Sequence, residues 1–127
     1  DAMPFVQAYH DWVAQATVGQ AVTPFNAANA HIGVGDGTAA FAVTQTDLQG
    51  TNKVRKPMET GYPTLSGNQA QFQSVFTETE ANFNWNEFGV FNAATGGVML
   101  GREVQNLGTK ASGTIWRMTV TVTWTAS

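Results

Sequence analysis

The sequence predicts a mostly β protein: a single-domain antiparallel β-sandwich or barrel with one helix at the N-terminus. Residues 114–125 alternate large apolar side chains with mainly threonine, which is typical of a strand in a sheet buried on one side. Several other short alternating segments are separated by turns rich in Gly, Asn and Thr, whereas one segment near the N-terminus has helical periodicity. A length of 127 residues suits one domain. Within it we expect a helical arm at residues 1–19 and a β core at residues 28–127.

The expected helix begins at Pro4, since proline is tolerated at the first helical position. Apolar residues then follow at helical spacing on one face: Phe5, Tyr9, Trp12, Val13 and Ala16. An exposed face of this kind would be costly, so it must pack on its own sheet or on a neighbouring subunit. We take Phe5, Tyr9 and Trp12 as candidate protein-interface residues, and packing on the chain's own sheet remains the alternative.

The segment 82–91 predicts a strand with one irregularity. Phe83 and Trp85 share one face, whereas Phe88 and Val90 have the opposite parity, and a β-bulge near residues 86–87 would bring all four to the same side. We expect these four residues to form one core with the apolar face of the last strand. That face consists of Trp116, Val120, Val122 and Trp124.

Glu87 lies inside this apolar segment. A buried carboxylate needs a compensating partner, and Arg102 or backbone amides are the candidates. We interpret Glu87 as structural, because a single carboxylate without a nucleophile, a base or an oxyanion donor makes no active site. A single capped helical turn is expected at residues 44–50.

The composition is poor in charge. Only 12% of the residues are Asp, Glu, Lys or Arg, about half the usual share, and the chain holds 17 Thr, 9 Asn and 9 Gln. A surface of neutral polar groups is easier to desolvate than an ionic one, which suits a subunit packed among other subunits. A monomer with a threonine-rich β surface is the alternative.

Several partner classes are not expected. The net charge is −3, and apart from Lys53, Arg55 and Lys56 the basic residues are scattered, so no nucleic-acid partner is predicted. Alternation places Lys53 and Arg55 on one face, which we interpret as a solvated strand edge. No apolar run approaches the ~20 residues that span a bilayer, so no membrane partner is expected.

No motif predicts an enzyme, so we expect no catalytic residue, no metal site and no cofactor. His10 and His31 lack the further ligands that a zinc site requires. Glu78 and Glu80 share one face of a strand end, which suits at most weak cation binding. The glycines of residues 33–37 lack the spacing of a phosphate-binding loop, and we interpret them as turn glycines with positive φ.

Two stretches resemble structural proteins of tailed bacteriophages. Residues 29–37 (Asn-Ala-His-Ile-Gly-Val-Gly-Asp-Gly), followed by 45–49 and 52–56, resemble a recurrent signature of small structural proteins in tailed-phage genomes. Residues 85–93 with 97–102 are similar to an Asn-Glu-hydrophobic-Gly-hydrophobic-Phe hairpin of phage tail-collar, fibre and head-associated proteins.

The resemblance implies a virion structural protein. The first expectation is a capsid decoration (cement) protein, a homotrimer that binds the major capsid protein on the surface of the head. The alternative is a tail-side adaptor, collar or fibre domain, in which exposed Asn, Gln and aromatic residues would bind a glycan. The small size and the low charge favour the first.

Overall fold

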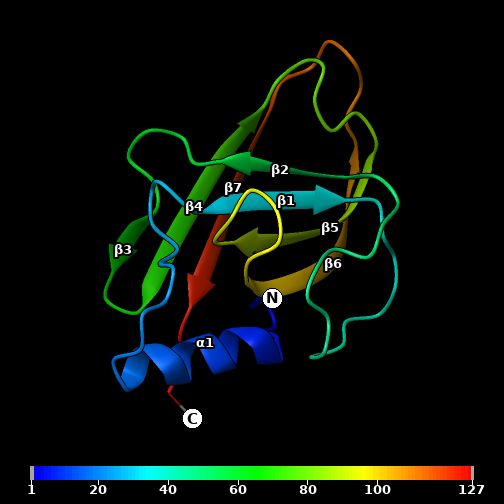
Figure 1. Ribbon diagram of the computed structural model, residues 1–127. Helices are drawn as coiled ribbons and strands as arrows, with labels where there is room; N and C mark the ends of the chain where they lie inside the picture. The colour runs from blue at the N-terminus through cyan, green and yellow to red at the C-terminus, as the bar shows by residue number, and fades with distance from the viewer. Residues whose placement is uncertain (1, 127) are drawn as a thin grey trace.

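The structure is a computed structural model that describes residues 2–126. It contains one helix and seven strands (Figure 1). In chain order these are α1 (Gln7–Thr17), β1 (His31–Gly35), β2 (Lys53–Pro57), β3 (Thr64–Ser66), β4 (Gln69–Phe76), β5 (Asn84–Phe91), β6 (Met99–Thr109) and β7 (Trp116–Thr123).

The strands form two antiparallel sheets. One sheet has the order β2-β1-β5-β6 and the other has the order β3-β4-β7. In Figure 1 the strands of the smaller sheet run steeply behind those of the larger one, and α1 lies across one end of both. This arrangement confirms the predicted mostly β fold with an N-terminal helix.

Alternation along the last strand builds one wall of the core, as the sequence predicts. Val120 and Val122 are buried, whereas the threonines that alternate with them are exposed. Facing them from the larger sheet, Trp85 is 1% exposed and makes an edge-to-face contact with Trp116, with 4.9 Å between ring centroids. The rest of the expected core is also present. Phe88 and Val90 are buried, and Phe83, Trp116 and Trp124 pack half-buried against the cluster.

The predicted β-bulge is present in β5. The register against β6 shifts between Trp85 and Glu87. As a result Trp85 and Phe88 both reach the core between the sheets, whereas Glu87 points away from it toward loop 36–52.

The N-terminal helix is shorter than predicted. It begins at Gln7, and the residues before it run extended along β6. Arg102 N donates to Pro4 O at 3.2 Å, and Val6 N donates to Leu100 O at 3.3 Å. Pro4 thus contributes its carbonyl to a sheet edge, where its missing N–H costs nothing. The prediction that Pro4 starts the helix is wrong, and α1 is tied to the sandwich through this short edge segment.

Replacing Trp85 with Ala should lower the free energy of unfolding by about 3–5 kcal/mol, because it removes a fully buried indole from between the sheets. Urea denaturation followed by fluorescence measures the change. The matched control is Val18→Ala, at a position that is 73% exposed, where the change should stay within about 0.5 kcal/mol. A loss below about 1 kcal/mol at Trp85 would contradict the assigned core.

Candidate functional site

The most buried ion pair among residues 2–126 joins Glu87 and Arg102. Both side chains are 0% exposed, and Arg102 Nε lies 2.7 Å from Glu87 Oε1. The same carboxylate oxygen accepts a hydrogen bond from Gln49 N at 2.8 Å. The other oxygen accepts from Gly37 N at 2.8 Å and from Gly50 N at 2.7 Å. The expected partners of Glu87, Arg102 and backbone amides, are both confirmed.

The guanidinium of Arg102 holds the same loop from its other nitrogens. Nη1 donates to Gln45 Oε1 at 3.0 Å, and Nη2 donates to Ala39 O at 3.0 Å. The ion pair and its hydrogen bonds therefore fasten both ends and the middle of loop 36–52 to the larger sheet. An irregular loop must satisfy its buried backbone groups in some way, and here a buried carboxylate and a guanidinium do so.

The helical turn predicted at residues 44–50 is wrong. This segment has no helical residue. The N–H groups of Gln49 and Gly50 donate to Glu87 instead of to carbonyls one turn earlier. A charged acceptor from a distant strand thus overrides the local capping pattern.

The glycines of residues 33–37 have a different role from the predicted one. None of Gly33, Gly35 and Gly37 has a positive φ. A Cβ at Gly33 would lie 2.6 Å from the ring of Phe91, and one at Gly35 would lie 2.5 Å from Glu87 Oε2. These positions need glycine because large side chains of the larger sheet pass directly over the backbone.

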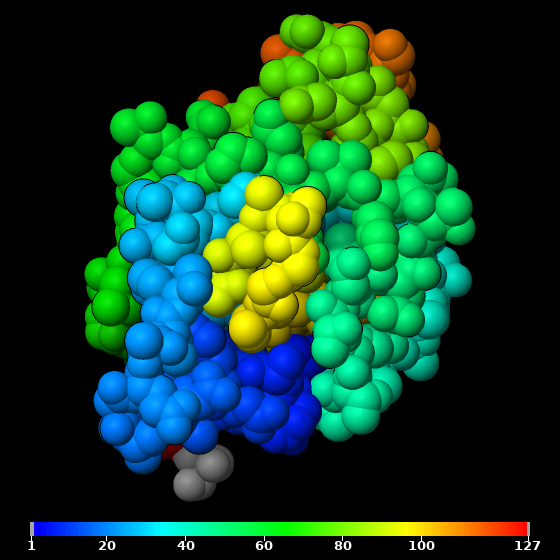
Figure 2. Space-filling model, viewed as in Figure 1, coloured from blue at the N-terminus to red at the C-terminus, as the bar shows by residue number. Residues whose placement is uncertain are grey.

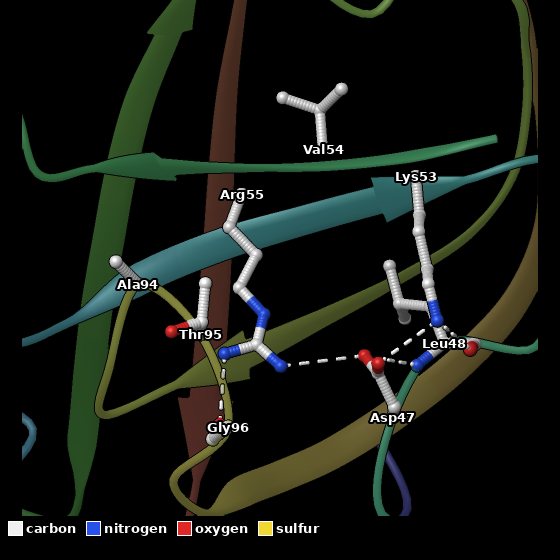
Figure 3. Close-up of a pocket in the computed structure, with 8 residues that line it drawn as sticks. All are labelled: Asp47, Leu48, Lys53, Val54, Arg55, Ala94, Thr95 and Gly96. Atoms are coloured by element: carbon white, nitrogen blue, oxygen red, sulfur yellow. Dashed lines mark hydrogen bonds and ion pairs between the residues drawn. The ribbon is translucent and has the colours of Figure 1, made fainter.

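A second polar cluster lines a hollow of about 260 Å³ between β2 and the turn after β5. Figure 3 shows Lys53 and Arg55 on the same side of β2, as predicted, with Val54 on the other. Lys53 Nζ lies 2.9 Å from Asp47 Oδ2, and Arg55 Nη2 lies 3.4 Å from Asp47 Oδ1. Partial burial raises the pKa of Asp47, but the hydrogen bond from Lys53 and the two cations outweigh it, so the pKa lies below its usual value.

Arg55 makes further contacts within the same chain. Nη1 donates to Ala93 O and to Gly96 O, each at 2.9 Å, and the guanidinium lies 3.6 Å from the centre of the Phe91 ring. Arg55 therefore fastens the turn after β5, and the interpretation of a solvated strand edge is wrong for Arg55, whose side chain is 13% exposed.

The residues considered for metal binding do not converge. His31 Nδ1 lies 2.8 Å from Asn29 O, and His10 is exposed on α1. Glu80 accepts hydrogen bonds from Lys56 Nζ at 2.7 Å and from Thr77. Across residues 2–126, no group of three or more His, Asp or Glu side chains lies close enough to hold an ion.

The three interface candidates belong to an aromatic cluster beside α1. Tyr9 is 4% exposed, and its hydroxyl accepts a hydrogen bond from Trp124 Nε1 at 2.7 Å. Burial raises the pKa of this phenol, and the hydrogen bond from Trp124 opposes that shift. Trp12 stacks on Tyr9 at 5.7 Å, and Phe5 contacts Tyr9 edge-to-face at 5.1 Å. Tyr9 thus packs on the chain's own sheet, whereas Phe5 and Trp12 keep part of their surface exposed.

This cluster forms one wall of an open groove of about 340 Å³, which we call the apolar groove. Its lining consists of Tyr9, Trp12, Phe25, Asn26, Pro63, Thr64, Leu65, Ala70, Phe72, Leu100 and Trp124. Leu65, at the rim on the edge strand β3, is 72% exposed. Sequence reasoning found Tyr9 and Trp12 from their periodicity but missed Phe25 and Leu65, which lie in segments without a clear pattern.

The outward face of the smaller sheet is almost uncharged, and we call it the Gln–Thr face. Glutamines of β4 donate across the strands to threonines of β7. These pairs are Gln69–Thr123 at 3.3 Å, Gln71–Thr121 at 3.5 Å and Gln73–Thr119 at 3.0 Å. All outward residues of β4 and β7 are described, and Arg117 is the charged one among them. Three glutamines and three threonines thus pair across this one regular surface.

No helix within residues 2–126 is long and apolar enough to cross a membrane. Comparisons with protein-family models, with curated proteins and with solved structures found no match.

Removing one member of the buried ion pair should be far more damaging than removing both. Glu87→Gln or Arg102→Met should each lower the free energy of unfolding by about 3–5 kcal/mol, because each leaves a buried partner uncompensated. In the double variant the loss should be clearly smaller than the sum of the two single losses. Chemical denaturation of the four proteins measures this coupling, and additive losses would contradict it. Asp47→Asn, at a partly exposed ion pair, is the control, with an expected loss of about 0–1 kcal/mol.

Stability should fall in acid as Glu80 becomes protonated. The hydrogen bond from Lys56, with those from Thr77, lowers the pKa of Glu80 from 4.5 to about 2. Because the folded state favours the ionised form, this stabilisation is complete above about pH 4.5 and is lost as the pH falls toward about 2. Thermal unfolding across this range should show a shallower decline for Glu80→Gln than for wild type. Glu78→Gln is the control, and equal slopes for wild type and Glu80→Gln would contradict the assignment.

Proposed function

We propose that this chain is a structural subunit of a tailed-bacteriophage virion, and in particular a capsid decoration (cement) protein that binds the assembled head. The observation that carries the proposal is the Gln–Thr face, a regular surface on which each of three glutamine amides already donates to a threonine hydroxyl on the neighbouring strand. Binding there displaces water from neutral groups that keep their own hydrogen bonds, so the desolvation penalty is low. The partner that this implies is another protein subunit, with the major capsid protein as the first candidate.

The residues that carry the phage resemblance also support a structural role. Gly33, Gly35, Glu87 and Arg102 all lie within the two resembling stretches. Glu87 and Arg102 form the buried ion pair, Gly35 leaves room for the Glu87 carboxylate, and Gly33 leaves room for the Phe91 ring. The shared pattern therefore describes a way of supporting a long loop on a sheet, which is what a rigid display scaffold requires.

A cement protein acts by mass action. It binds assembled shell in preference to free capsid subunits, and so it raises the resistance of the shell to heat. Since the Gln–Thr face carries few ions, its binding should depend weakly on salt.

The tail-side alternative is favoured by one feature, the apolar groove. Trp12 and Phe25 offer aromatic surface there, and Asn26 adds an amide beside it. Aromatic and amide groups together are also suited to stacking on and hydrogen bonding to a sugar ring. In that case the chain would serve as an adaptor, collar or fibre domain.

Cryo-electron imaging of the phage particle whose genome encodes this chain tests the proposal. Regularly spaced copies on the head surface are expected. Attachment at the tail alone would support the adaptor alternative, and absence from the particle would contradict a virion role.

A charge placed on the Gln–Thr face should weaken binding. Gln71→Glu should reduce the affinity for particles lacking this protein by at least about tenfold, because an unpaired carboxylate would be buried at the interface. Co-sedimentation at low and high salt measures the affinity. Gln15→Glu on exposed α1 is the matched control and should bind like wild type. Equal affinity of both variants, or binding by wild type that disappears at high salt, would contradict this mechanism.

Binding to particles must be tested with point substitutions and not by deleting the N-terminal residues 1–19. Met3, Val6 and Tyr9 belong to the core, so deletion of residues 1–19 would remove part of it. A loss of binding after that deletion would not distinguish unfolding from a lost contact.

A further inference from the structure

We propose that copies of this chain associate head-to-tail, with residues 38–43 of one copy seated in the apolar groove of the next. This inference rests on the proposed function, in which the chain is a structural subunit that binds other subunits. It names the surfaces through which the chain binds itself, and it is tested on the purified chain without a particle.

The apolar groove is built to receive an uncharged extended segment. None of the residues that line it carries a full charge at neutral pH. Its outer wall is β3, which pairs with β4 along one edge only. The other edge of β3 therefore presents backbone donors and acceptors that a partner segment can pair with.

Residues 38–43 (Thr-Ala-Ala-Phe-Ala-Val) have the matching chemistry. The segment contains no ionisable side chain, and all of it is exposed except Phe41, which is half-buried. Val43 is 54% exposed. Within residues 2–126, the N–H groups of residues 38–42 donate no hydrogen bond, so they are free to pair with a neighbour.

The segment is also held in place before binding. Ala39 O accepts from Arg102 Nη2 at 3.0 Å, Ala40 O accepts from Gln45 Nε2 at 3.0 Å, and Val43 O accepts from Gln7 N at 2.8 Å. Several of its carbonyls are thus used internally, whereas the N–H groups of residues 38–42 donate no hydrogen bond within residues 2–126. A fixed loop loses little conformational entropy on binding, which favours association.

The positions of the two surfaces determine the type of assembly. In Figures 1 and 2 the loop that contains residues 38–43 runs down one flank of the molecule, and β3 lies on the opposite flank. A contact between two different surfaces is heterologous, so it generates a closed ring or an open chain and not a two-fold dimer. A three-membered ring would match the homotrimer that the phage resemblance implies.

Two charge substitutions test this arrangement. Leu65→Asp damages the groove, and Val43→Asp damages the inserted segment. Both positions are largely exposed, so both variants should fold, which near-ultraviolet circular dichroism verifies. Wild type should be oligomeric by sedimentation velocity and native mass spectrometry. Each variant alone should be monomeric, with its dissociation constant raised on the order of 100-fold by the unpaired buried carboxylate.

Mixing the two variants tests the head-to-tail contact most directly. The Leu65→Asp variant keeps an intact segment 38–43, which can enter the intact groove of the Val43→Asp variant. The other two surfaces, the groove of Leu65→Asp and the segment of Val43→Asp, are both damaged and cannot bind a third copy. The mixture should therefore form a 1:1 heterodimer and nothing larger. Ile115→Asp, at an exposed position on the distal β6–β7 hairpin, is the control and should assemble like wild type.

Other outcomes overturn the inference. A monomeric wild type, a mixture that stays monomeric, or an Ile115→Asp variant that falls apart would each contradict the head-to-tail contact. A monomeric wild type that still binds particles would leave the proposed function standing, with the groove then available to a capsid segment or a glycan. Assembly as expected without any particle binding would contradict the proposed function instead.

Discussion

Glu87 and Arg102 bring two full charges into a fold that has few of them, and loop 36–52 is held by their hydrogen bonds. Burying an ion pair costs several kcal/mol per ion and is tolerated only when the remaining donors and acceptors are satisfied. That condition is met, because both oxygens of Glu87 accept two hydrogen bonds and all three nitrogens of Arg102 donate. The loop has no regular secondary structure, and hydrogen bonds to the pair satisfy several of its backbone groups instead.

The bulge in β5 makes this arrangement possible. Without it Trp85 and Glu87 would face the same side, and the core between the sheets would contain a carboxylate. The shift in register between Trp85 and Glu87 lets Trp85 face the core while Glu87 faces the loop. The apolar core and the polar support therefore lie on opposite faces of the same strand, and the loop presents residues 38–43 on a fixed frame.

Features that depend on neighbouring residues were predictable, and those that depend on distant contacts were less so. Alternation identified the last strand, and the parity break before Phe88 identified the bulge. The partners of Glu87 followed from the cost of an unpaired buried charge. The small space at Gly33 was not predictable, because it depends on Phe91 in another strand. The groove around Leu65 had no local signal either, since segments far apart in the chain form it.

Native-state hydrogen exchange of the amides of Gly37, Gln49 and Gly50 tests most directly whether the buried pair holds the loop. If Glu87 anchors these N–H groups, they open only when the molecule unfolds, and their opening free energies should equal that of Val90 in the core of β5. Exchange as fast as that of an exposed turn such as residues 94–96 would contradict the account, because the loop would then open independently of the sandwich.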